Sequence, residues 1–340
     1  ITLTGIGVVD GVAGDTASMN TFTNMDTIIG TAGIDNITGA NSDNVWKPTA
    51  NNAGEIDLDA LTLAGIADVT YSAIERITGG TQQDTLNYTA YTTSLTIDLS
   101  TGSANDVNGG AAGFVTLNTF ENVIGGSADD TLTGDANANI LDGRAGVDNI
   151  LGLGGNDTLI GGTGDDVMDG GLGDDVYGFS DGWGTDTVND QAGEGVDTIS
   201  MAEMVFYFNT YSATSTAMTF DIANAIVTDG AYDTLGTCGT NCVTYDNTLT
   251  ESLTGGAGAD NFYFVNNDVV LGSIDGHTGN DTLDYSQLTY DVDLQATSVG
   301  TLDGFAGIDN TTPITITTAW DNIDILRGSS VDGDSFTGIN

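Results

Sequence analysis

Apolar side chains recur at a fixed interval in the middle of the chain. Between residues 125 and 178 the sequence divides without insertion into six nine-residue units: GGSADDTLT, GDANANILD, GRAGVDNIL, GLGGNDTLI, GGTGDDVMD and GGLGDDVYG. The eighth position is always apolar or aromatic, namely Leu132, Leu141, Ile150, Leu159, Met168 and Tyr177. Alternate side chains of an extended segment point to opposite faces, so this position is predicted to face a core.

A second column of the same units is polar. The sixth position holds Asp130, Asn139, Asp148, Asp157, Asp166 and Asp175. Glycines at the start of each unit permit a tight turn, and two units then make one coil of a flattened spiral with a turn at each edge. Residues 18 apart are predicted to stack on the same edge. Strands lie roughly 4.8 Å apart, so the stacked carboxylates would repel one another unless a cation lay between successive turns.

Fainter copies extend the pattern in both directions. They place further carboxylates at the sixth position: Asp35, Asp84, Asp186, Asp197, Asp260 and Asp281. Acidic lead-ins precede several copies, at residues 74–80, 120–126, 251–256 and 321–329, and alternating segments at 95–102, 218–225 and 290–297 indicate half-buried strands. We therefore predict an all-β fold, a parallel β-roll or β-solenoid of nonapeptide repeats with β-rich insertions around residues 40–70, 200–250 and 285–320.

The same pattern suggests how the chain is organised. Neither a Pro-rich nor a Ser-rich linker divides it, which favours one continuous elongated body. Four segments are expected along it: an N-terminal degenerate repeat and β-rich segment at 1–70, a central roll at 71–199, an insertion at 200–250 and a C-terminal repeat-like segment at 251–340. The insertion carries an aromatic cluster of Phe206, Tyr207, Phe208 and Tyr211, for which both core packing and a contact surface are open interpretations.

Charge narrows the possible functions. The chain has 49 acidic residues, of which 43 are Asp, against 4 basic ones, for a net charge of −45. Binding to nucleic acid or insertion into a membrane is therefore not expected, because neither a cationic surface nor an apolar run of transmembrane length exists. Disorder is the alternative for so acidic a chain, but 39% of the residues are hydrophobic. The charge then requires a counter-ion, and calcium is the hard cation that carboxylates favour.

On these units the chain resembles the RTX calcium-binding proteins, whose repeat G-G-x-G-x-D-x-U-x forms a parallel β-roll. The resemblance implies several bound Ca²⁺ ions, held by backbone carbonyls of the turns and by sixth-position side chains. By this resemblance the ligands are Asp130, Asp148, Asp157, Asp166 and Asp175, with Asp35, Asp84, Asp186, Asp197, Asp260 and Asp281 in the fainter copies. Asn139 is a neutral amide where the family has Asp, so the site that it shares with Asp157 is expected to be weaker. Secretion in an unfolded state and folding on meeting calcium outside are also implied.

The two cysteines and the first residues suggest an extracellular protein. Cys238 and Cys242 are four residues apart in a glycine-containing loop, where a small disulfide can close in an oxidising compartment. A zinc site is the alternative, but the one histidine, His277, is distant and does not complete four ligands. The chain begins without Met and without a signal-like segment, so a processed form or an excised piece is expected.

No catalytic residue is predicted. One G-x-S-x-G occurs at residues 178–182, but it ends the repeat run, and the one possible base, His277, lies inside another repeat. A turn leaving the roll explains the motif, and two histidines for a zinc protease do not exist. We therefore expect a protein that is not an enzyme.

The leading hypothesis is a secreted, calcium-loaded structural protein on a bacterial cell surface: a filament, S-layer or matrix subunit. Residues 1–7 read like a repeat tail and residues 334–340 like the start of a repeat, which suggests end-to-end self-association. One alternative is the calcium-folding tail of a larger RTX-type secreted toxin or hydrolase. Another is an adhesin that binds glycans or a surface through residues 200–215.

Overall fold

The computed structural model is built from β-strands. It describes residues 2–6, 12–16, 19–25, 27–29, 36–38, 43–50, 53–57, 69–72, 76–104, 119–180, 182–189, 195–201, 204–206, 209–211, 219–221, 226–228, 242–244, 252–264, 273–311 and 319–338. Within these ranges no helix occurs, and hence none that could cross a bilayer. The strands pair mostly in parallel, which confirms the predicted all-β solenoid of repeats.

The chain divides into two compact units. Unit 1 comprises residues 1–157 and 206–209, and unit 2 comprises residues 158–205 and 210–340. The division into four segments and the single elongated body stay predictions. Strands β22 (Met204–Phe206) and β23 (Asn209–Tyr211) form a separate two-stranded sheet.

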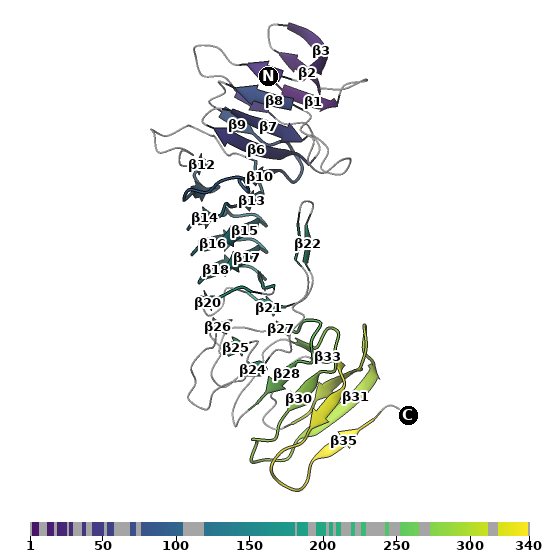
Figure 1. Ribbon diagram of the computed structural model, residues 1–340. Helices are drawn as coiled ribbons and strands as arrows, with labels where there is room; N and C mark the ends of the chain where they lie inside the picture. The colour runs from purple at the N-terminus through teal and green to yellow at the C-terminus, as the bar shows by residue number, and fades with distance from the viewer. Residues whose placement is uncertain are drawn as a thin grey trace. The chain divides into compact units, whose positions relative to one another are not determined.

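The regular repeats of unit 1 form successive rungs on two sheets (Figure 1). One sheet runs β15-β13-β10-β6-β7-β8-β4 and the other β16-β14-β11-β12. In the regular repeats, partners in parallel pairs are 18 residues apart, as in Asn122 with Ile140 and Thr131 with Asn149. The predicted 18-residue coil is thereby confirmed. The bounds are β4 (Thr27–Ile29), β6 (Val45–Ala50), β7 (Ala53–Asp57), β8 (Val69–Ser72), β10 (Thr85–Asn87), β11 (Thr96–Asp98), β12 (Ser103–Ala104), β13 (Asn122–Ile124), β14 (Thr131–Thr133), β15 (Ile140–Ala145) and β16 (Asn149–Gly154).

Unit 1 also contains a smaller sheet near the start of the chain. Its order is β3-β2-β1-β5-β9, and the β1–β2 and β2–β3 pairs are antiparallel. The bounds are β1 (Thr2–Ile6), β2 (Val12–Thr16), β3 (Met19–Met25), β5 (Asn36–Thr38) and β9 (Arg76–Thr78). The last two strands pair in parallel and belong to the fainter repeats.

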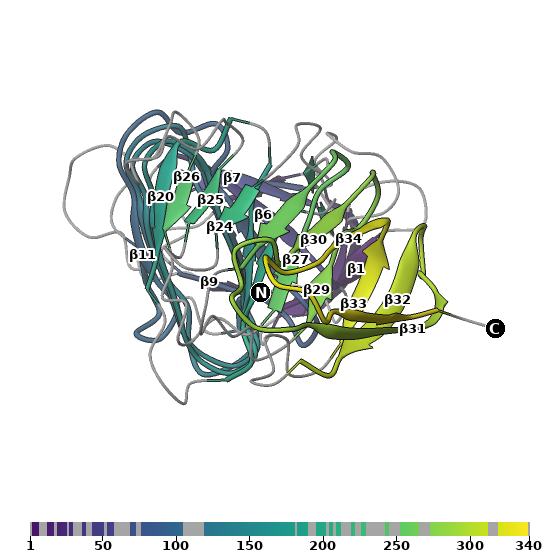
Figure 2. The ribbon, with the colours of Figure 1, turned by 90° about the horizontal axis from the view of Figure 1, so that it is seen from below.

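Unit 2 continues the two-sheet plan with longer interruptions. Its sheets run β17-β19-β21-β27-β29-β33-β32-β31-β35 and β18-β20-β26-β25-β24-β28-β30-β34. Figure 2 shows strands β29, β33 and β32 side by side, as this order requires. The bounds are β17 (Thr158–Thr163), β18 (Val167–Leu172), β19 (Val176–Gly178), β20 (Thr185–Val188), β21 (Thr198–Ser200), β24 (Thr219–Asp221), β25 (Ile226–Thr228), β26 (Cys242–Thr244), β27 (Ser252–Thr254), β28 (Asn261–Tyr263), β29 (Ile274–Asp275), β30 (Thr282–Asp284), β31 (Asp293–Val299), β32 (Phe305–Asp309), β33 (Trp320–Ile323), β34 (Ile325–Arg327) and β35 (Ser335–Thr337).

The predicted insertions are antiparallel excursions within these sheets. Strands β6, β7 and β8 form one such meander in unit 1. In unit 2, β24, β25 and β26 form a second, and β31, β32 and β33 form a third. Each excursion adds strands to a sheet while leaving the repeat strands parallel, so insertion does not break the roll.

The core is the eighth-position column. All six side chains of the regular repeats are at most 1% exposed: Leu132, Leu141, Ile150, Leu159, Met168 and Tyr177. The fainter repeats supply Leu86, Phe262 and Leu283, which are fully buried as well. The period-nine apolar signal therefore predicted the core correctly.

The glycine pattern reflects the backbone of the turns. The fourth position of a unit has φ of +130° at Gly146 and +112° at Gly155, a region that side chains strongly disfavour. A Cβ on Gly155 would lie 2.4 Å from the backbone carbon of Asn137 in the coil before. The second position is also left-handed, at Leu153 (φ +78°) and at His277 (φ +66°), where glycine is expected.

Candidate calcium sites along the edges of the roll

The sixth-position side chains are buried although they are polar. Every one that the structure describes is at most 2% exposed: Asp84, Asp130, Asn139, Asp148, Asp157, Asp166, Asp175, Asp186, Asp197, Asp260 and Asp281. Asp35 lies outside the described residues. Burial of so many carboxylates is costly unless hydrogen bonds or a counter-charge compensate for the lost water.

Hydrogen bonds between coils supply part of this compensation. The backbone N–H of Asp130 donates to Oδ1 of Asp148 at 2.7 Å, and that of Asn139 donates to Oδ1 of Asp157 at 2.7 Å. Asp130 and Asp148 thus lie on one edge and Asn139 and Asp157 on the other, as predicted. The same bond recurs in unit 2, in the pairs Asp166–Asp186 (2.8 Å), Asp175–Asp197 (2.8 Å) and Asp260–Asp281 (2.7 Å). We call this series of bonds the carboxylate ladder.

The second carboxylate oxygen turns toward the start of its own unit. Oδ2 of Asp130 accepts the N–H of Gly126 at 2.8 Å, and Oδ2 of Asp260 accepts that of Gly256 at 2.7 Å. This oxygen lies directly over the first glycine, since a Cβ on Gly161 would be 2.3 Å from Oδ2 of Asp166. The first glycine is therefore needed to make room for the acid group.

Asn139 occupies the sixth position of its unit with a neutral side chain. Its Oδ1 accepts the N–H of Asp135 at 2.8 Å, and its Nδ2 donates to the carbonyl of Glu121 at 2.9 Å. In the same unit Asp135 and Asn137 replace turn glycines, and Oδ1 of Asp135 accepts the N–H of Asn137 at 2.7 Å. This Asx-type bond holds the turn where glycine is missing. A weaker ion site at Asn139 stays a prediction.

Burial shifts the titration of these acids despite their hydrogen bonds. Desolvation raises the pKa of Asp157 to about 6 and that of Asp84 to about 6. The pKa of Asp186 rises to about 8, chiefly through burial and then through the charges of Asp166 and Asp165. Ionised carboxylates in the edges therefore need a compensating positive charge. The whole chain has only 4 basic residues that could provide it. Bound hard cations would supply that charge, and carboxylate and carbonyl oxygens are the ligands that calcium takes.

Some members of these columns, Glu121 and Asp324 among them, were not recognised in the sequence. Oε2 of Glu121 accepts the N–H of Asp84 at 2.8 Å, and Oδ2 of Asp324 accepts the N–H of Asp281 at 3.0 Å. Both therefore occupy the sixth position of their coils. Burial raises the pKa of Glu121 to about 7. The signal was present in the acidic lead-ins, because each places a carboxylate one residue before a repeat strand.

Asp334 follows the same rule ahead of β35. Its Oδ1 accepts the N–H of Val292 at 3.0 Å, and its Oδ2 accepts that of Ser329 at 2.8 Å. A carboxylate that bonds both to the coil before and to its own turn is therefore a property of the fold. It is not confined to the six regular units.

The cysteine pair and the aromatic cluster cannot be compared with their predictions in the described residues. Cys238 and the side chain of Cys242 lie outside them, so the disulfide stays a prediction. The side chains of Phe206, Tyr207, Phe208 and Tyr211 also lie outside them.

His277 takes part in its own turn. Its N–H donates to Oδ1 of Asp275 at 2.9 Å, and its Nδ1 is 3.4 Å from Oγ1 of Thr278. The left-handed backbone of His277 matches the glycine that a repeat has at this position.

Comparison with known families agrees with this geometry. The model of the RTX calcium-binding nonapeptide repeat (4 copies) matches residues 22–45, 118–150 and 142–177. No curated protein matches the chain. The matched segments cover the regular units and the region of the first faint copy, while the ladder continues past them to Asp281. The chain thus carries RTX calcium-binding nonapeptide repeats on a parallel β-roll, and it is a calcium-binding protein of a type that is typically secreted.

Proposed function

We propose that the chain is a secreted structural protein of a bacterial cell surface, a filament, S-layer or matrix subunit that calcium holds folded. The observation that carries this proposal is the distribution of the buried carboxylates. They recur from Asp84 in unit 1 to Asp281 in unit 2, so the acid groups support the fold along its length. An enzyme would instead gather its polar groups in one cleft.

The surroundings of the candidate catalytic groups support a role without catalysis. The contacts of His277 described above lie within its own turn, at Asp275 and Thr278. A general base must reach the proton that it removes, and no described bond connects His277 to Ser180. On this proposal the G-x-S-x-G sequence has no catalytic role.

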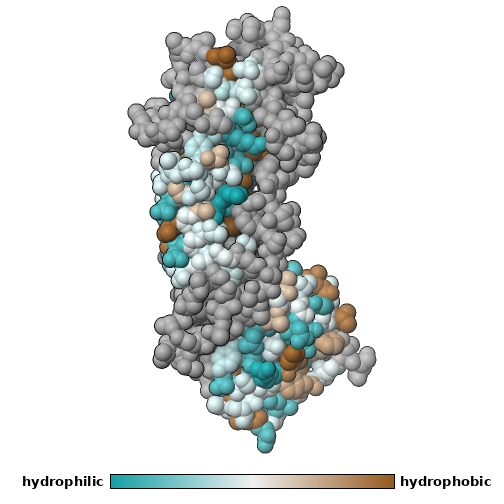
Figure 3. Space-filling view, in the orientation of Figure 1, coloured by the Kyte–Doolittle hydropathy of each residue, from teal (hydrophilic) through white to brown (hydrophobic). Residues whose placement is uncertain are grey.

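Exposed strand edges support self-association. Among the described strands, β34 and β35 each end a sheet order of unit 2. The C-terminal part of this unit displays apolar side chains on its surface (Figure 3), including Phe305 (46% exposed), Ile325 (39%) and Phe336 (49%). An edge strand offers unpaired N–H and C=O groups to another chain, and apolar neighbours strengthen such contacts. End-to-end stacking of subunits would use both.

Electron microscopy and sedimentation of the full chain test this function. In calcium we expect filaments or ordered arrays that dissociate when a chelator is added. Phe336→Asp should shift the assembly toward monomer without changing the far-UV spectrum, because the side chain is half exposed. Val147→Asp is the matched control, since Val147 is exposed on a turn of the regular repeats. A monomer at all concentrations in calcium, or arrays that persist in chelator, would contradict the proposal.

A further inference from the structure

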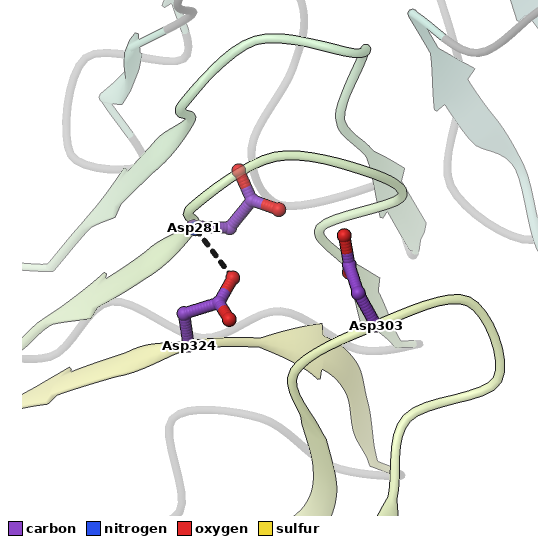
Figure 4. A group of neighbouring side chains, drawn as sticks. All are labelled: Asp281, Asp303 and Asp324. Atoms are coloured by element: carbon purple, nitrogen blue, oxygen red, sulfur yellow. Dashed lines mark hydrogen bonds between the residues drawn. The ribbon is translucent and has the colours of Figure 1, made fainter.

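A third carboxylate approaches the ladder where a hairpin is inserted. Asp281 and Asp324 are successive sixth-position residues, and Asp303 lies in the loop between β31 and β32 (Figure 4). One carboxylate oxygen from each of the three lies within 4.8 Å of the others. Asp303 belongs to no repeat unit, so this cluster differs from the pairs of equivalent residues along the regular edges.

Two buried oxygens of the cluster lack a hydrogen-bond partner among the described residues. Asp281 is fully buried, and its Oδ2 accepts no hydrogen bond while its Oδ1 accepts the N–H of Asp260. Oδ1 of Asp303 is likewise buried without a partner, while its Oδ2 accepts the N–H of Gly279 at 3.1 Å. An unpartnered buried carboxylate oxygen costs free energy, which a cation would recover.

Among the described residues, no ion pair joins a positive side chain to any of these three acids. The one ion pair that the described residues form joins Arg327 to Asp284. Burial, followed by the charges of Asp260, Asp324 and Asp303, raises the pKa of Asp281 to about 7. Three carboxylates therefore face one another with repulsion that hydrogen bonds alone do not remove.

The loop that carries Asp303 is held firmly in place. Oδ1 of the buried Asn322 accepts the N–H groups of Leu302 (2.7 Å) and Asp303 (3.2 Å). Its Nδ2 donates at 2.7 Å to Oδ1 of Asp275, which ends β29 just before the repeat that contains Asp281. A second anchor is Asp321, which accepts the N–H of Thr301 at 3.1 Å and its hydroxyl at 2.8 Å. The acid group is thus positioned before any ion arrives, which lowers the entropic cost of binding.

We propose that Asp281, Asp303 and Asp324 together bind one calcium ion, which fastens the β31–β32 hairpin to the roll. Calcium takes oxygen ligands at about 2.3–2.6 Å, so a single ion can contact three oxygens that are all within 4.8 Å of one another. The absence of His and Cys from the cluster disfavours zinc. The inference rests on the calcium-binding character of the chain but not on its assembly into filaments.

The hairpin also forms part of an apolar pocket. A cavity of about 450 Å³ in unit 2 is lined by Leu294, Phe305, Trp320 and Phe336, and Asp324 lies at its wall. Leu294 and Phe305 belong to the two strands that the ion would fasten. Calcium at the cluster would therefore fix the shape of this pocket as well as the position of the loop.

Hydrogen exchange of the full chain, with and without calcium, tests the site. Calcium at ten times its Kd should slow exchange of residues 299–305 by about tenfold in the wild type. Asp303→Asn should abolish this protection and lower the bound calcium, measured by equilibrium dialysis, by one ion per chain. Asparagine retains an oxygen for the N–H of Gly279, so the hydrogen bond is preserved. Asp332→Asn removes an exposed charge in the same unit and should change neither quantity.

The two proposals fail in different ways. If Asp303→Asn keeps both the calcium-dependent protection of residues 299–305 and the full number of ions, the site proposed here is wrong. Exchange of residues 140–178 reports on the regular repeats in the same experiment. Calcium-dependent protection there, in wild type and Asp303→Asn alike, shows that the variant is folded and that the loss at the hairpin is local.

Discussion

The regular repeats and the C-terminal coils share the same inter-coil carboxylate bond and the same buried core position, but their coils differ in length. At residues 125–178 the laddered residues are 18 apart, as in Asp130 and Asp148. Farther along, Asp260 and Asp281 are 21 apart, and Asp281 and Asp324 are 43 apart. Phe262 and Leu283 of these coils are as fully buried as Leu132. A coil is therefore defined by its carboxylate bond and its core side chain, and its length is free to vary.

The extra length also changes the chemistry of the edge. A regular coil consists only of its turns and strands. The interval from Asp281 to Asp324 contains the hairpin that brings Asp303 to the ladder. Insertion can thus add a carboxylate to the edge without disturbing the register of β30 and β34, which remain paired in parallel.

Removal of calcium should have the largest effect, and it should affect both regions. If three sites were filled at a hundredfold excess over Kd, they would contribute about 8 kcal/mol to folding, which is comparable to the whole stability of a typical domain, about 5–15 kcal/mol. The metal-free chain should therefore be largely unfolded at neutral pH. Melting followed by circular dichroism, in calcium and after dialysis against EDTA, measures this. An unchanged melting temperature would contradict the role of the ion.

Glycine replacement at the fourth position should be nearly as damaging in either region. Gly155→Ala combines a left-handed φ of +112° with a contact of 2.4 Å, and Gly279→Ala would place a Cβ 1.7 Å from the carbonyl oxygen of Gly258. We expect each to cost about 2–5 kcal/mol. Gly182→Ala is the control, because φ is +86° but no atom lies within 4 Å. Its cost should be only about 1–2 kcal/mol, and equal costs at all three sites would exclude the close contact as the cause. Urea denaturation in calcium provides the free energies.

Acid should partly replace calcium in the metal-free chain. The pKa of Asp186 is raised to about 8 and that of Asp281 to about 7, so the folded state holds these protons more tightly than the unfolded state does. Their contribution to stability is fully present below about pH 4, the unfolded pKa, and it is lost as pH rises through the folded values. In EDTA the folded fraction should therefore increase from pH 8 to pH 5.

Asparagine at these positions should flatten this dependence. Asp186→Asn removes a group whose pKa in the folded state is about 8, and Asp281→Asn removes one whose pKa is about 7. Each unit of pKa shift corresponds to about 1.4 kcal/mol. Circular dichroism in EDTA across this pH range, compared with wild type, provides the measurement. Both variants should bind calcium less tightly, and an unchanged pH profile in both would show that these acids do not control it.

The smallest effect is expected at the second position of the unit. Leu153 and His277 adopt left-handed backbones in the two regions, with φ of +78° and +66°. Replacement by glycine should stabilise the chain by about 0.5–1 kcal/mol, because the relieved strain exceeds the added chain entropy. Leu172→Gly serves as the control, since Leu172 is exposed and has no left-handed φ. It should destabilise by a similar amount in the same denaturation assay, and a gain there would contradict the explanation.

Periodicity made the core and the regular edges predictable. Two columns in phase sufficed to place Leu159 inside and Asp157 on an edge, because every coil there repeats the same length. The β-rich insertions could be located as well, since the nine-residue pattern fades in them. The bond from each carboxylate to the backbone of the preceding coil was not foreseen. Repulsion between stacked acids was expected instead, because main-chain donors carry no signature in a sequence.

Variable coil length concealed the remaining members of the site. Glu121 and Asp324 occupy ladder positions, but intervals of 37 and 43 residues separate them from Asp84 and Asp281. Asp303 could not have been predicted from the sequence at all. Its place depends on the bonds that Asn322 makes across the hairpin, and no motif marks it. Local rules about the residue before a strand could have found the first two, but only tertiary structure reveals the third.

The ladder has a direction. Each carboxylate accepts its inter-coil bond from the N–H of the equivalent residue in the preceding coil, as Asp148 does from Asp130, 18 residues earlier. The sixth-position N–H of a coil therefore has no carboxylate to bond to until the next coil has formed. That next coil supplies the acceptor. The two faces of any stack of coils consequently differ, one offering acceptors and the other donors. If subunits stack end to end as proposed above, these bonds would favour head-to-tail contacts over head-to-head ones, and the assembly would have a polarity.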